Sequence, residues 1–348
     1  MENDGLINVK NAKDLNNLIG LKKEKSEMQK IINAMSSNGI SESLAIVSGV
    51  VGSGKSEILA STCKALAEIG LDVTAVELSQ RHFVRGNHWD IIENWFTGLG
   101  SEAGSVLWLD EAHEICARAK PDAQTATLLP ILRALCENET QSGVSHEKLG
   151  NGDVFKVMGS KDIIFLSSNY ADHFPSYIVS RAKVANMSLT RYTNAECVAI
   201  FEIISKARKF ELESVNVAKI CGNAVRGNAR TLKSIATKIE ISLAGKEKLV
   251  DENTMRNACK LSKCYPYGVS DLGIELLQKL AIRPVKSDSF RVINTQFSKE
   301  EHVAEELFLR NIEIGNEKNG LTNKVGSTYT ITKTGLNYID NITKKGWL

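Results

Sequence analysis

The stretch IVSGVVGSGKSEI, which begins at Ile46, combines residue types that bind phosphate groups. Its spacing is the G-x-x-x-x-G-K-[ST] order of a phosphate-binding loop, carried by Gly49, Gly52, Gly54, Lys55 and Ser56. Glycines let backbone N–H groups turn toward phosphate oxygens, and the helix that follows offers the positive end of its dipole. We expect Lys55 to reach the terminal phosphates and Ser56 to bind Mg²⁺. The stretch predicts a nucleotide site.

A second stretch, SVLWLDEAHE from Ser105, supplies the carboxylates that nucleotide hydrolysis requires. Val106 to Leu109 is typical of a short buried strand, and Asp110 and Glu111 follow it. At this place in P-loop enzymes, one carboxylate binds Mg²⁺ and another polarises the attacking water. A glycine turn and an unrelated acidic strand end would explain each stretch separately, but not both in this order. ATP hydrolysis with Mg²⁺ is therefore the expected chemistry.

Short apolar strands alternate with helices around these residues. Strands are expected at Leu44 to Ser48, Asp72 to Leu78 and Asp162 to Ser168, and helices at Glu57 to Glu68 and within Leu15 to Ala34. Asn169 ends the last strand, where its amide can position the hydrolytic water, although an asparagine there can equally start a turn. An apolar turn that includes Ile19 precedes the first strand. It can pack on the core or cover an adenine ring.

Two polar segments between the strands are candidates for partner binding. QRHFVRGNHWD, from Gln80, alternates cationic with aromatic side chains and can contact a nucleic-acid backbone, although an ordinary surface loop is the simpler interpretation. A helix is expected at roughly 123–136. After it, glycines in the polar segment 137–160 predict a hairpin.

The second half of the chain has a different pattern. Helical periodicity runs through consecutive segments from Thr193 to Cys264. Beyond them, helices are expected at Leu272 to Leu280, around Phe290 to Asn294 and at Lys299 to Asn311, followed by a two-stranded wing in NGLTNKVGSTYTITKTG. Three helices and a wing are typical of a small DNA-binding architecture.

Bulk composition restricts the function only weakly. The 348 residues allow two or three domains, and 43% hydrophobic with 24% charged residues is ordinary for a folded protein. A net charge of +2 neither predicts nor excludes a polyanionic partner. The seven cysteines form no C-x-x-C pair and are expected to be reduced thiols. No signal sequence and no apolar run of membrane-spanning length occur, so a cytoplasmic protein without a membrane partner is expected.

The order of these motifs resembles that of an AAA+ ATPase, and within that class the RuvB family of Holliday-junction branch-migration motors. The resemblance spans nearly the whole chain, from LNNLIGLKKEK through the phosphate loop and LDEAHEI to SRAKV, GNARTL and TKTG. It implies an α/β P-loop AAA+ core, a parallel sheet with flanking helices, at 1–188. It further implies an all-α lid at 189–264 and a C-terminal winged-helix DNA-binding domain at 265–348.

The resemblance also implies roles for individual residues. The nucleotide contacts are expected from Gly49, Gly52, Ser53, Gly54, Lys55, Ser56, Glu57 and Ile19, and the Mg²⁺ ligands are Ser56 and Asp110. The catalytic residues are Glu111, which activates water, Asn169 as sensor one, Arg181 as the finger given to a neighbouring subunit, and Arg230 as sensor two. The expected DNA contacts are Lys318, Lys324 and Lys333. The resemblance implies ATP and Mg²⁺ as cofactors. It implies duplex or branched DNA and further copies of the chain, in a ring of six, as partners.

Several departures from the family pattern bear on the partners. Val50 and Val51 stand where the family commonly has prolines, and we expect this change to leave the anion cradle intact. The 137–160 hairpin, a possible protein-binding element, is polar, so we expect no dependence on the usual junction-binding partner. In the wing tip NKVGSTY only Lys324 is cationic. The DEAH string also names a helicase group, but those enzymes need two RecA-like domains, and one phosphate loop is present.

Three functions fit this sequence. The first is a ring-shaped DNA motor that hydrolyses ATP at subunit interfaces and moves along or branch-migrates duplex DNA. The second is an ATP-gated loader or recruiter, of the helicase-loader, clamp-loader or transposition type, that binds DNA without translocating. The third, a protein-remodelling ATPase, would use the C-terminal domain to bind proteins. The order of domains favours the motor, and the changed hairpin and wing favour the recruiter.

Overall fold

The computed structural model describes residues 6–78, 91–92, 94–95, 103–113, 159–170, 174–244, 248–286, 299–314 and 320–348, with the side chains of residues 299 and 300 left out. These residues belong to two compact units, Met1–Thr190 and Arg191–Leu348. The basic loop from Gln80, the helix at 123–136, nearly all of the hairpin at 137–160, the helix around Phe290 and Lys318 lie outside the described residues. The predictions for those segments stay predictions.

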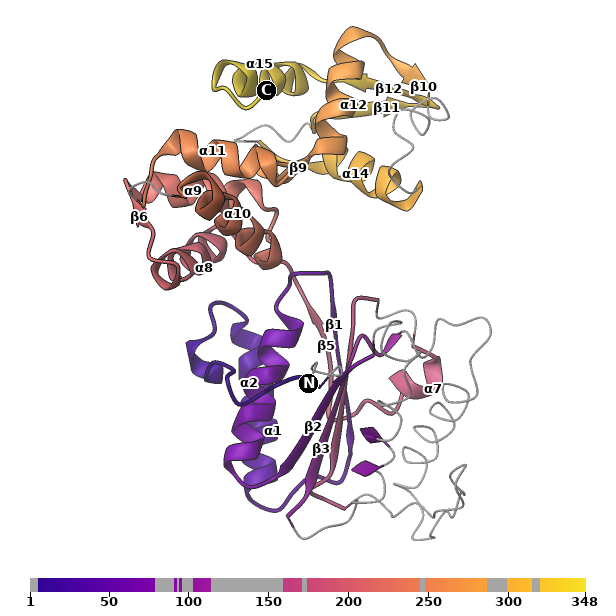
Figure 1. Ribbon diagram of the computed structural model, residues 1–348. Coiled ribbons are helices and arrows are strands. Elements are labelled where there is room, and N and C mark those ends of the chain that lie inside the picture. The colour runs from indigo at the N-terminus through magenta and orange to yellow at the C-terminus, as the bar shows by residue number, and fades with distance from the viewer. Residues whose placement is uncertain are drawn as a thin grey trace. The chain divides into compact units, whose positions relative to one another are not determined.

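A five-stranded parallel sheet forms the centre of the first unit (Figure 1). Its strands are β1 (Leu44–Gly49), β2 (Asp72–Glu77), β3 (Ser105–Asp110), β4 (Ile163–Ser168) and β5 (Ala185–Leu189). The spatial order is β2-β3-β4-β1-β5, and all neighbours run parallel. Strand β4 therefore lies between β1 and β3. The residues that follow these three strands meet at one edge of the sheet, where parallel α/β proteins bind their ligands.

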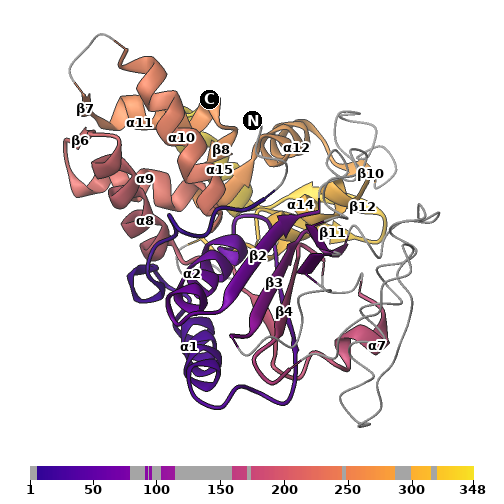
Figure 2. The ribbon, with the colours of Figure 1, turned by 60° about the horizontal axis from the view of Figure 1, so that its bottom comes forward.

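Apolar side chains explain why β1, β3 and β4 occupy the middle of this sheet. Nearly every residue of the three strands is buried, which is typical of parallel strands covered on both faces. Helices α1 (Lys22–Ser36) and α2 (Lys55–Glu68) pack side by side on one face, as Figures 1 and 2 show. Met28, Ile31 and Ile32 form the buried side of α1, as the periodicity predicted.

A boundary error of two residues concerns the start of α2. The sequence predicted a start at Glu57, whereas the helix begins two residues earlier, at Lys55. Gly54 is the N-cap residue and has φ +96°, a left-handed conformation that glycine adopts without steric cost. The early start places Lys55 and Ser56 in the first helical turn.

Four helices form the first part of the second unit. They are α8 (Asn194–Ala207), α9 (Val215–Ala224), α10 (Ala229–Ser242) and α11 (Glu252–Leu261). Side-chain caps define three of their starts, because Thr193, Asn228 and Asp251 accept hydrogen bonds from backbone N–H groups of the first turn. Two two-residue strands, β6 (Glu211–Leu212) and β7 (Leu249–Val250), pair in parallel within this otherwise helical region.

The C-terminal part of the second unit combines helices with a small antiparallel sheet. Its elements are β8 (Cys264–Tyr265), β9 (Val269–Ser270), α12 (Asp271–Ile282), β10 (Val285–Lys286), α14 (Lys299–Asn311), β11 (Thr322–Val325), β12 (Thr328–Ile331) and α15 (Lys333–Lys344). Strands β11 and β12 form the predicted hairpin, and β10 adds a third strand beside β12. The bounds of α14 are those predicted. Helix α15 was not predicted.

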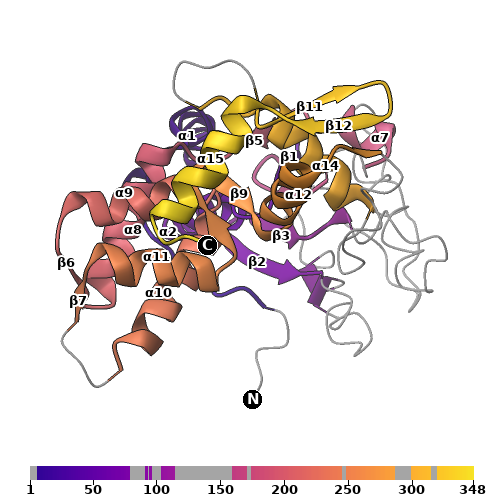
Figure 3. The ribbon, with the colours of Figure 1, turned by 90° about the horizontal axis from the view of Figure 1, so that it is seen from above.

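One hydrophobic core runs through the whole second unit. It begins with Cys197 and Phe201 in α8 and ends with Tyr338 and Ile342 in α15 and Trp347 beyond it. Figure 3 shows α15 together with the helices of this unit. The division at residue 264 into a lid and a winged-helix domain therefore stays a prediction, because the two parts share their core.

Two further observations concern cysteines and membranes. The described cysteines are free, and burial raises the pKa of Cys197 to about 11 and that of Cys264 to about 12. Among the described residues, no three histidine, cysteine or acidic side chains are grouped as a metal site would need. Within the same residues, every helix is too short or too polar to cross a membrane.

Candidate functional site

Left-handed glycines shape the phosphate loop between β1 and α2. Gly49, Gly52 and Gly54 have φ of +145°, +80° and +96°. A Cβ on Gly49 would lie 2.7 Å from the Leu189 carbonyl oxygen and 2.9 Å from Ser53 Oγ, so a larger residue would push β5 and the loop apart. Ser53 Oγ is buried, and no hydrogen-bond partner lies near it in the described part of the chain. The loop is therefore tightly packed, and the Ser53 hydroxyl is available to a ligand.

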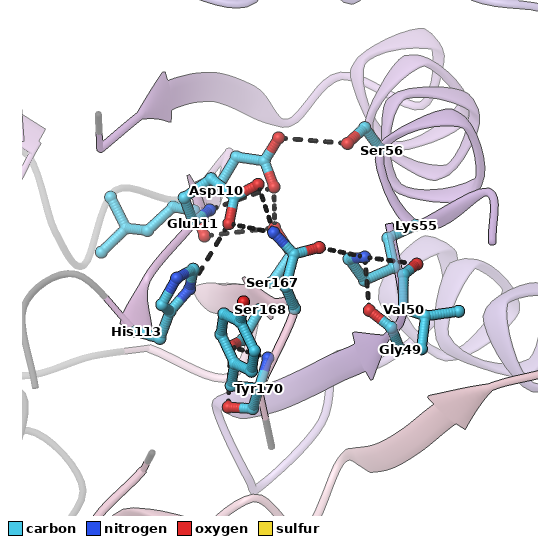
Figure 4. A network of polar contacts seen from close by, with 12 residues as sticks. Gly49, Val50, Lys55, Ser56, Asp110, Glu111, His113, Ser167, Ser168 and Tyr170 are labelled. Carbon is cyan, nitrogen blue, oxygen red and sulfur yellow. Dashed lines mark hydrogen bonds and ion pairs between the residues drawn. The ribbon is translucent and has the colours of Figure 1, made fainter. Parts of the chain in front are cut away.

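Lys55 connects this loop to the end of β4. Its side chain is almost fully buried, and Nζ donates to the carbonyl oxygens of Gly49 at 2.6 Å and Val50 at 3.1 Å. It also donates to Asn169 Oδ1 at 2.8 Å. Figure 4 shows these contacts converging on the lysine from the strand ends. The ammonium group is thereby held at the mouth of the loop, where a phosphate would lie.

A serine and a carboxylate stand opposite each other across the site. Ser56 Oγ donates to Asp110 Oδ2 at 3.1 Å, and Ser167 Oγ donates to Asp110 Oδ1 at 2.5 Å (Figure 4). Trp108 Nε1 donates in turn to Ser167 Oγ at 2.9 Å, so a buried indole orients the hydroxyl. Oxygen ligands of this kind suit a hard divalent cation such as Mg²⁺. The residues present fit the nucleotide and metal that the sequence predicts.

Glu111 has an uncommon backbone and a well-restrained carboxylate. Its φ is +54°, and its N–H donates to Asp110 Oδ1 at 3.1 Å. Asn169 Nδ2 donates to both carboxylate oxygens, at 2.9 and 2.7 Å. Burial and the charge of Asp110 raise the pKa of Glu111, while the hydrogen bond from Asn169 and the charge of Lys55 oppose that change. A left-handed non-glycine residue at such a place is often functional.

The structure brings together most of the predicted nucleotide-site residues. Those that lie in the cluster are Gly49, Gly52, Ser53, Gly54, Lys55, Ser56, Asp110, Glu111 and Asn169. Glu57 instead points to solvent, with a carboxylate oxygen 3.8 Å from Lys13 Nζ. Ile19 is half-buried in the turn before α1, beside the left-handed Gly20.

The two predicted arginines lie outside this cluster. Arg181 follows α7 (Ser176–Val179) and is half-buried, with its guanidinium donating to the Tyr177 carbonyl oxygen at 3.0 Å. Arg230 belongs to the second unit, where it is the exposed second residue of α10. Their roles toward a nucleotide stay predictions.

The predicted DNA contacts are restrained to different degrees. Lys324 Nζ lies 3.9 Å from a carboxylate oxygen of Glu306 and 4.8 Å from the centre of the Tyr329 ring. Lys333 is exposed and is the first residue of α15. The single cation of the wing tip thus has an anionic neighbour within the chain, which lowers its availability to phosphate.

Sequence reasoning missed four residues of the site. Trp108 and Ser167 support Asp110 from inside the sheet, and nothing in their sequence context distinguishes them from other strand residues. His113 and Tyr170 lie beside Glu111 and Asn169. Their positions in the sequence, close to Glu111 and Asn169, could have identified them. The DEAH string was considered only as a possible sign of a helicase.

Comparison with known proteins agrees with this geometry. Residues 45–188 match the family model described as "ATPase family associated with various cellular activities (AAA)". No curated protein sequence matches the chain. Residues 45–188 are therefore similar to AAA ATPases, in agreement with the parallel sheet and the phosphate loop that they contain.

Solved structures extend the likeness over nearly the whole chain. A mutant of Thermotoga maritima RuvB gives a TM-score of 0.62 at 13% identity, covering 94% of this chain and 98% of that chain. Thermotoga maritima RuvB, described as a Holliday junction branch migration motor, gives 0.60 at 14% identity, with 96% and 99% covered. The Aeropyrum pernix ORC2 protein, solved as ADPNP–ADP complexes, gives 0.52 at 14% identity, with 97% and 98% covered. At these identities the likeness establishes the fold alone, and that fold is RuvB-like.

Proposed function

We propose that this chain hydrolyses ATP at the edge of the sheet where β1, β3 and β4 end. The observation that carries the proposal is the continuous set of hydrogen bonds from Lys55 through Asn169 to Glu111. An ammonium group and a carboxylate thus lie at the two ends of one side-chain amide. Such an arrangement is suited to in-line attack of water on a terminal phosphate.

Different residues of the chain would bind the phosphates, hold Mg²⁺ and activate the water. Lys55 and the backbone of the phosphate loop bind the phosphates, and Ser56 and Asp110 would hold Mg²⁺. When bound, the ion neutralises charge on the phosphate oxygens. Glu111 polarises the attacking water, and Asn169 fixes the direction in which its carboxylate points. The raised pKa of Glu111 makes the carboxylate a better proton acceptor than a solvated one.

We further propose that the chain assembles into a ring, with six subunits as the expected number. Arg181 would stabilise the charge developing on the phosphoryl group of a neighbouring subunit, and Arg230 would approach the nucleotide from the chain's own second unit. This assignment rests on the positions of SRAKV and GNARTL relative to the RuvB family pattern. It predicts that a monomeric form hydrolyses ATP poorly.

The finer part of the proposal is that hydrolysis moves duplex or branched DNA. Support comes from the RuvB-like fold and from two helices and a hairpin, α12, α14 and β11–β12, that the predicted winged helix would contain. Lys318, Lys333 and, less effectively, Lys324 would contact the DNA backbone without reading sequence. The basic loop from Gln80 is a further proposed contact.

A loader or recruiter is the alternative, and one observation favours it. Lys324, the wing-tip cation, lies beside Glu306 and against the Tyr329 ring, and therefore offers little to a phosphate backbone. A wing tip whose one cation is paired within the chain is better suited to assembly than to pulling on DNA. In that case hydrolysis times the release of a partner.

The wild type and Glu111→Gln test these proposals together. The variant should bind ATP normally but hydrolyse it at least about 100-fold more slowly, since it lacks the water-polarising carboxylate. A variant as active as the wild type would remove Glu111 from the reaction. Glu27→Gln, at a half-buried glutamate of α1 that pairs with Lys30, is the matched control and should retain full activity.

The same pair of proteins distinguishes the motor from the recruiter. Both are incubated with ATP and with duplex or four-way-junction DNA, and the bound fraction and the conversion of junctions into duplex arms are measured. Junction conversion by the wild type alone supports the motor. Equal binding by both proteins, without conversion by either, supports the recruiter.

A further inference from the structure

We infer that His113 is a positioning residue for the catalytic carboxylate of Glu111, and that Tyr170 holds His113 in place. This role rests on the proposed ATP hydrolysis. Within that reaction, His113 would orient the Glu111 carboxylate. The inference concerns His113, the last residue of the DEAH string, to which the motifs described above assign no role. Its evidence is a chain of contacts on the side of Glu111 away from Lys55.

His113 contacts the carboxylate directly. Its Nδ1 lies 3.4 Å from Glu111 Oε2, and Figure 4 shows the imidazole and the carboxylate facing each other. The side chain of His113 is 8% exposed, whereas that of Glu111 is 31% exposed. A buried ring therefore lies against a carboxylate that is still open to water. This is the arrangement expected of a group that restricts another group's motion.

Tyr170 fixes the imidazole from its other side. The two rings meet edge to face, with centroids 5.1 Å apart and an angle of 73° between the planes. An edge-to-face arrangement of two rings is attractive beyond the area that they bury. The Tyr170 backbone is itself restrained, because its N–H donates to Ser168 Oγ at 2.9 Å and its carbonyl accepts from the same hydroxyl at 2.8 Å.

Consecutive residues after β4 thus hold Glu111 by two routes. Asn169 binds the carboxylate directly, and Tyr170 acts through His113. The first route depends on Lys55, since the Asn169 amide accepts from the ammonium while it donates to Glu111. When Lys55 turns to a phosphate, that anchor of the amide is weakened. The contact with His113 does not involve Lys55 and keeps the carboxylate directed throughout.

The turn at Glu111 makes a second support necessary. Its left-handed backbone is fixed by the hydrogen bond to Asp110 and by the Ala112 N–H, which donates to the Ser167 carbonyl oxygen at 2.8 Å. The backbone is therefore determined, but the long side chain retains rotatable bonds. Misplacement of a reacting group by about 1 Å can reduce a rate about 100-fold.

The test measures kcat, KM and ATP affinity for the full chain and its variants. His113→Ala should lower kcat by about 10- to 100-fold while the dissociation constant of a fluorescent ATP analogue changes less than about 2-fold. His113→Asn should restore most of the rate, because its amide nitrogen can take the place of Nδ1. A merely structural role would lower affinity and thermal stability together and would not be rescued by asparagine.

Tyr170 gives the second variant. Tyr170→Ala should lower kcat by about 2- to 12-fold, the equivalent of one ring pair, and Tyr170→Phe should lower it less. Tyr267→Ala is the matched control, since Tyr267 is a similarly exposed tyrosine of the second unit, and its kcat should equal that of the wild type.

The outcomes separate this inference from the proposed function. An active wild type with an equally active His113→Ala overturns the role of His113 and leaves ATP hydrolysis standing. A wild type that binds the analogue but does not hydrolyse ATP overturns both. Loss of rate in His113→Ala with recovery in His113→Asn supports both.

Discussion

The polar cluster around Lys55 in the first unit and the one around Arg226 in the second unit are built in different ways. Arg226 donates to Glu305 at 2.9 Å, and its guanidinium lies 3.4 Å from the centre of the Phe308 ring. Glu305 is 7% exposed at its side chain and also accepts from the Ser270 N–H at 3.2 Å. Burial lowers the pKa of Arg226, and the charge of Glu305 opposes that change. The second cluster is internally paired.

The Lys55 cluster, by contrast, leaves groups available for a ligand. Ser53 Oγ is buried without a hydrogen bond in the described residues, and Ser56 lies exposed beside Asp110. Lys55 donates to carbonyl oxygens that a phosphate could replace. Disrupting this cluster should therefore change binding more than folding, whereas disrupting the Arg226 cluster should change folding more than binding.

Lys55→Ala tests the first half of this comparison and should have the largest effect. ATP affinity should fall about 100-fold, since a hydrogen bond from a charged donor contributes about 1.5–3 kcal/mol. The free energy of unfolding without nucleotide should change little. Isothermal titration calorimetry measures the affinity, and Lys64→Ala, on the same helix, is the control that should bind ATP as the wild type does.

Arg226→Met tests the second half. Removing the guanidinium leaves the buried Glu305 carboxylate without its ion-pair partner, so the second unit should lose about 2–3 kcal/mol of unfolding free energy. Urea unfolding measures the loss, and ATP affinity should stay within about 2-fold. Arg208→Met is the control, because its more exposed pair with Glu240 should contribute less than about 1 kcal/mol. Equal losses in the two variants would contradict the internally paired description.

A smaller effect concerns how the free energy of unfolding of the second unit depends on pH. Asp251 caps α11 by accepting from the Thr254 N–H at 2.7 Å, and hydrogen bonds from the side chain and the backbone of Thr254 lower its pKa in the folded chain. The stabilisation is present above the unfolded pKa of about 3.9 and is lost as the pH falls through the lower folded value. Asp251→Ala should cost about 1 kcal/mol at pH 7 and progressively less in acid. Urea unfolding at several pH values measures this difference.

The contribution of Glu111 to stability should change with pH in the opposite direction to that of Asp251. Its pKa is raised in the folded chain, so its favourable contribution is present below the unfolded value of about 4.3 and is lost as the pH rises through the folded value. Glu111→Gln should therefore unfold less easily than the wild type at pH 7, with a difference that disappears in acid. Two carboxylates that responded alike would contradict the assigned environments.

Local motifs explain how much of the nucleotide site could be predicted. Lys55, Asp110 and Asn169 each end or follow a recognisable strand, and parallel strands bring their carboxyl ends to one edge. The contact between His113 and Tyr170 could not be predicted in this way. It depends on how the turns after β3 and β4 pack together, and the sequence of one turn does not predict the conformation of the other.

The C-terminal part shows the same limit. The hairpin and the bounds of α14 follow from local periodicity and turn residues, and both were predicted. Helix α15 was not, because its first residues were interpreted as the close of a family pattern. Lys324 looked available in the sequence, and only the packing of α14 against β11 brings Glu306 to it.

The shared core of the second unit has a consequence for the order in which the chain folds during synthesis. The sheet of the first unit has all its strands once Leu189 has left the ribosome. The core that begins at Cys197 still lacks Trp347, which packs near Tyr265 with ring centroids 6.4 Å apart. Because domains fold as units, the first unit can fold while the second must wait for nearly the entire chain. A nascent chain would therefore present a formed phosphate loop well before the helices of the second unit have settled.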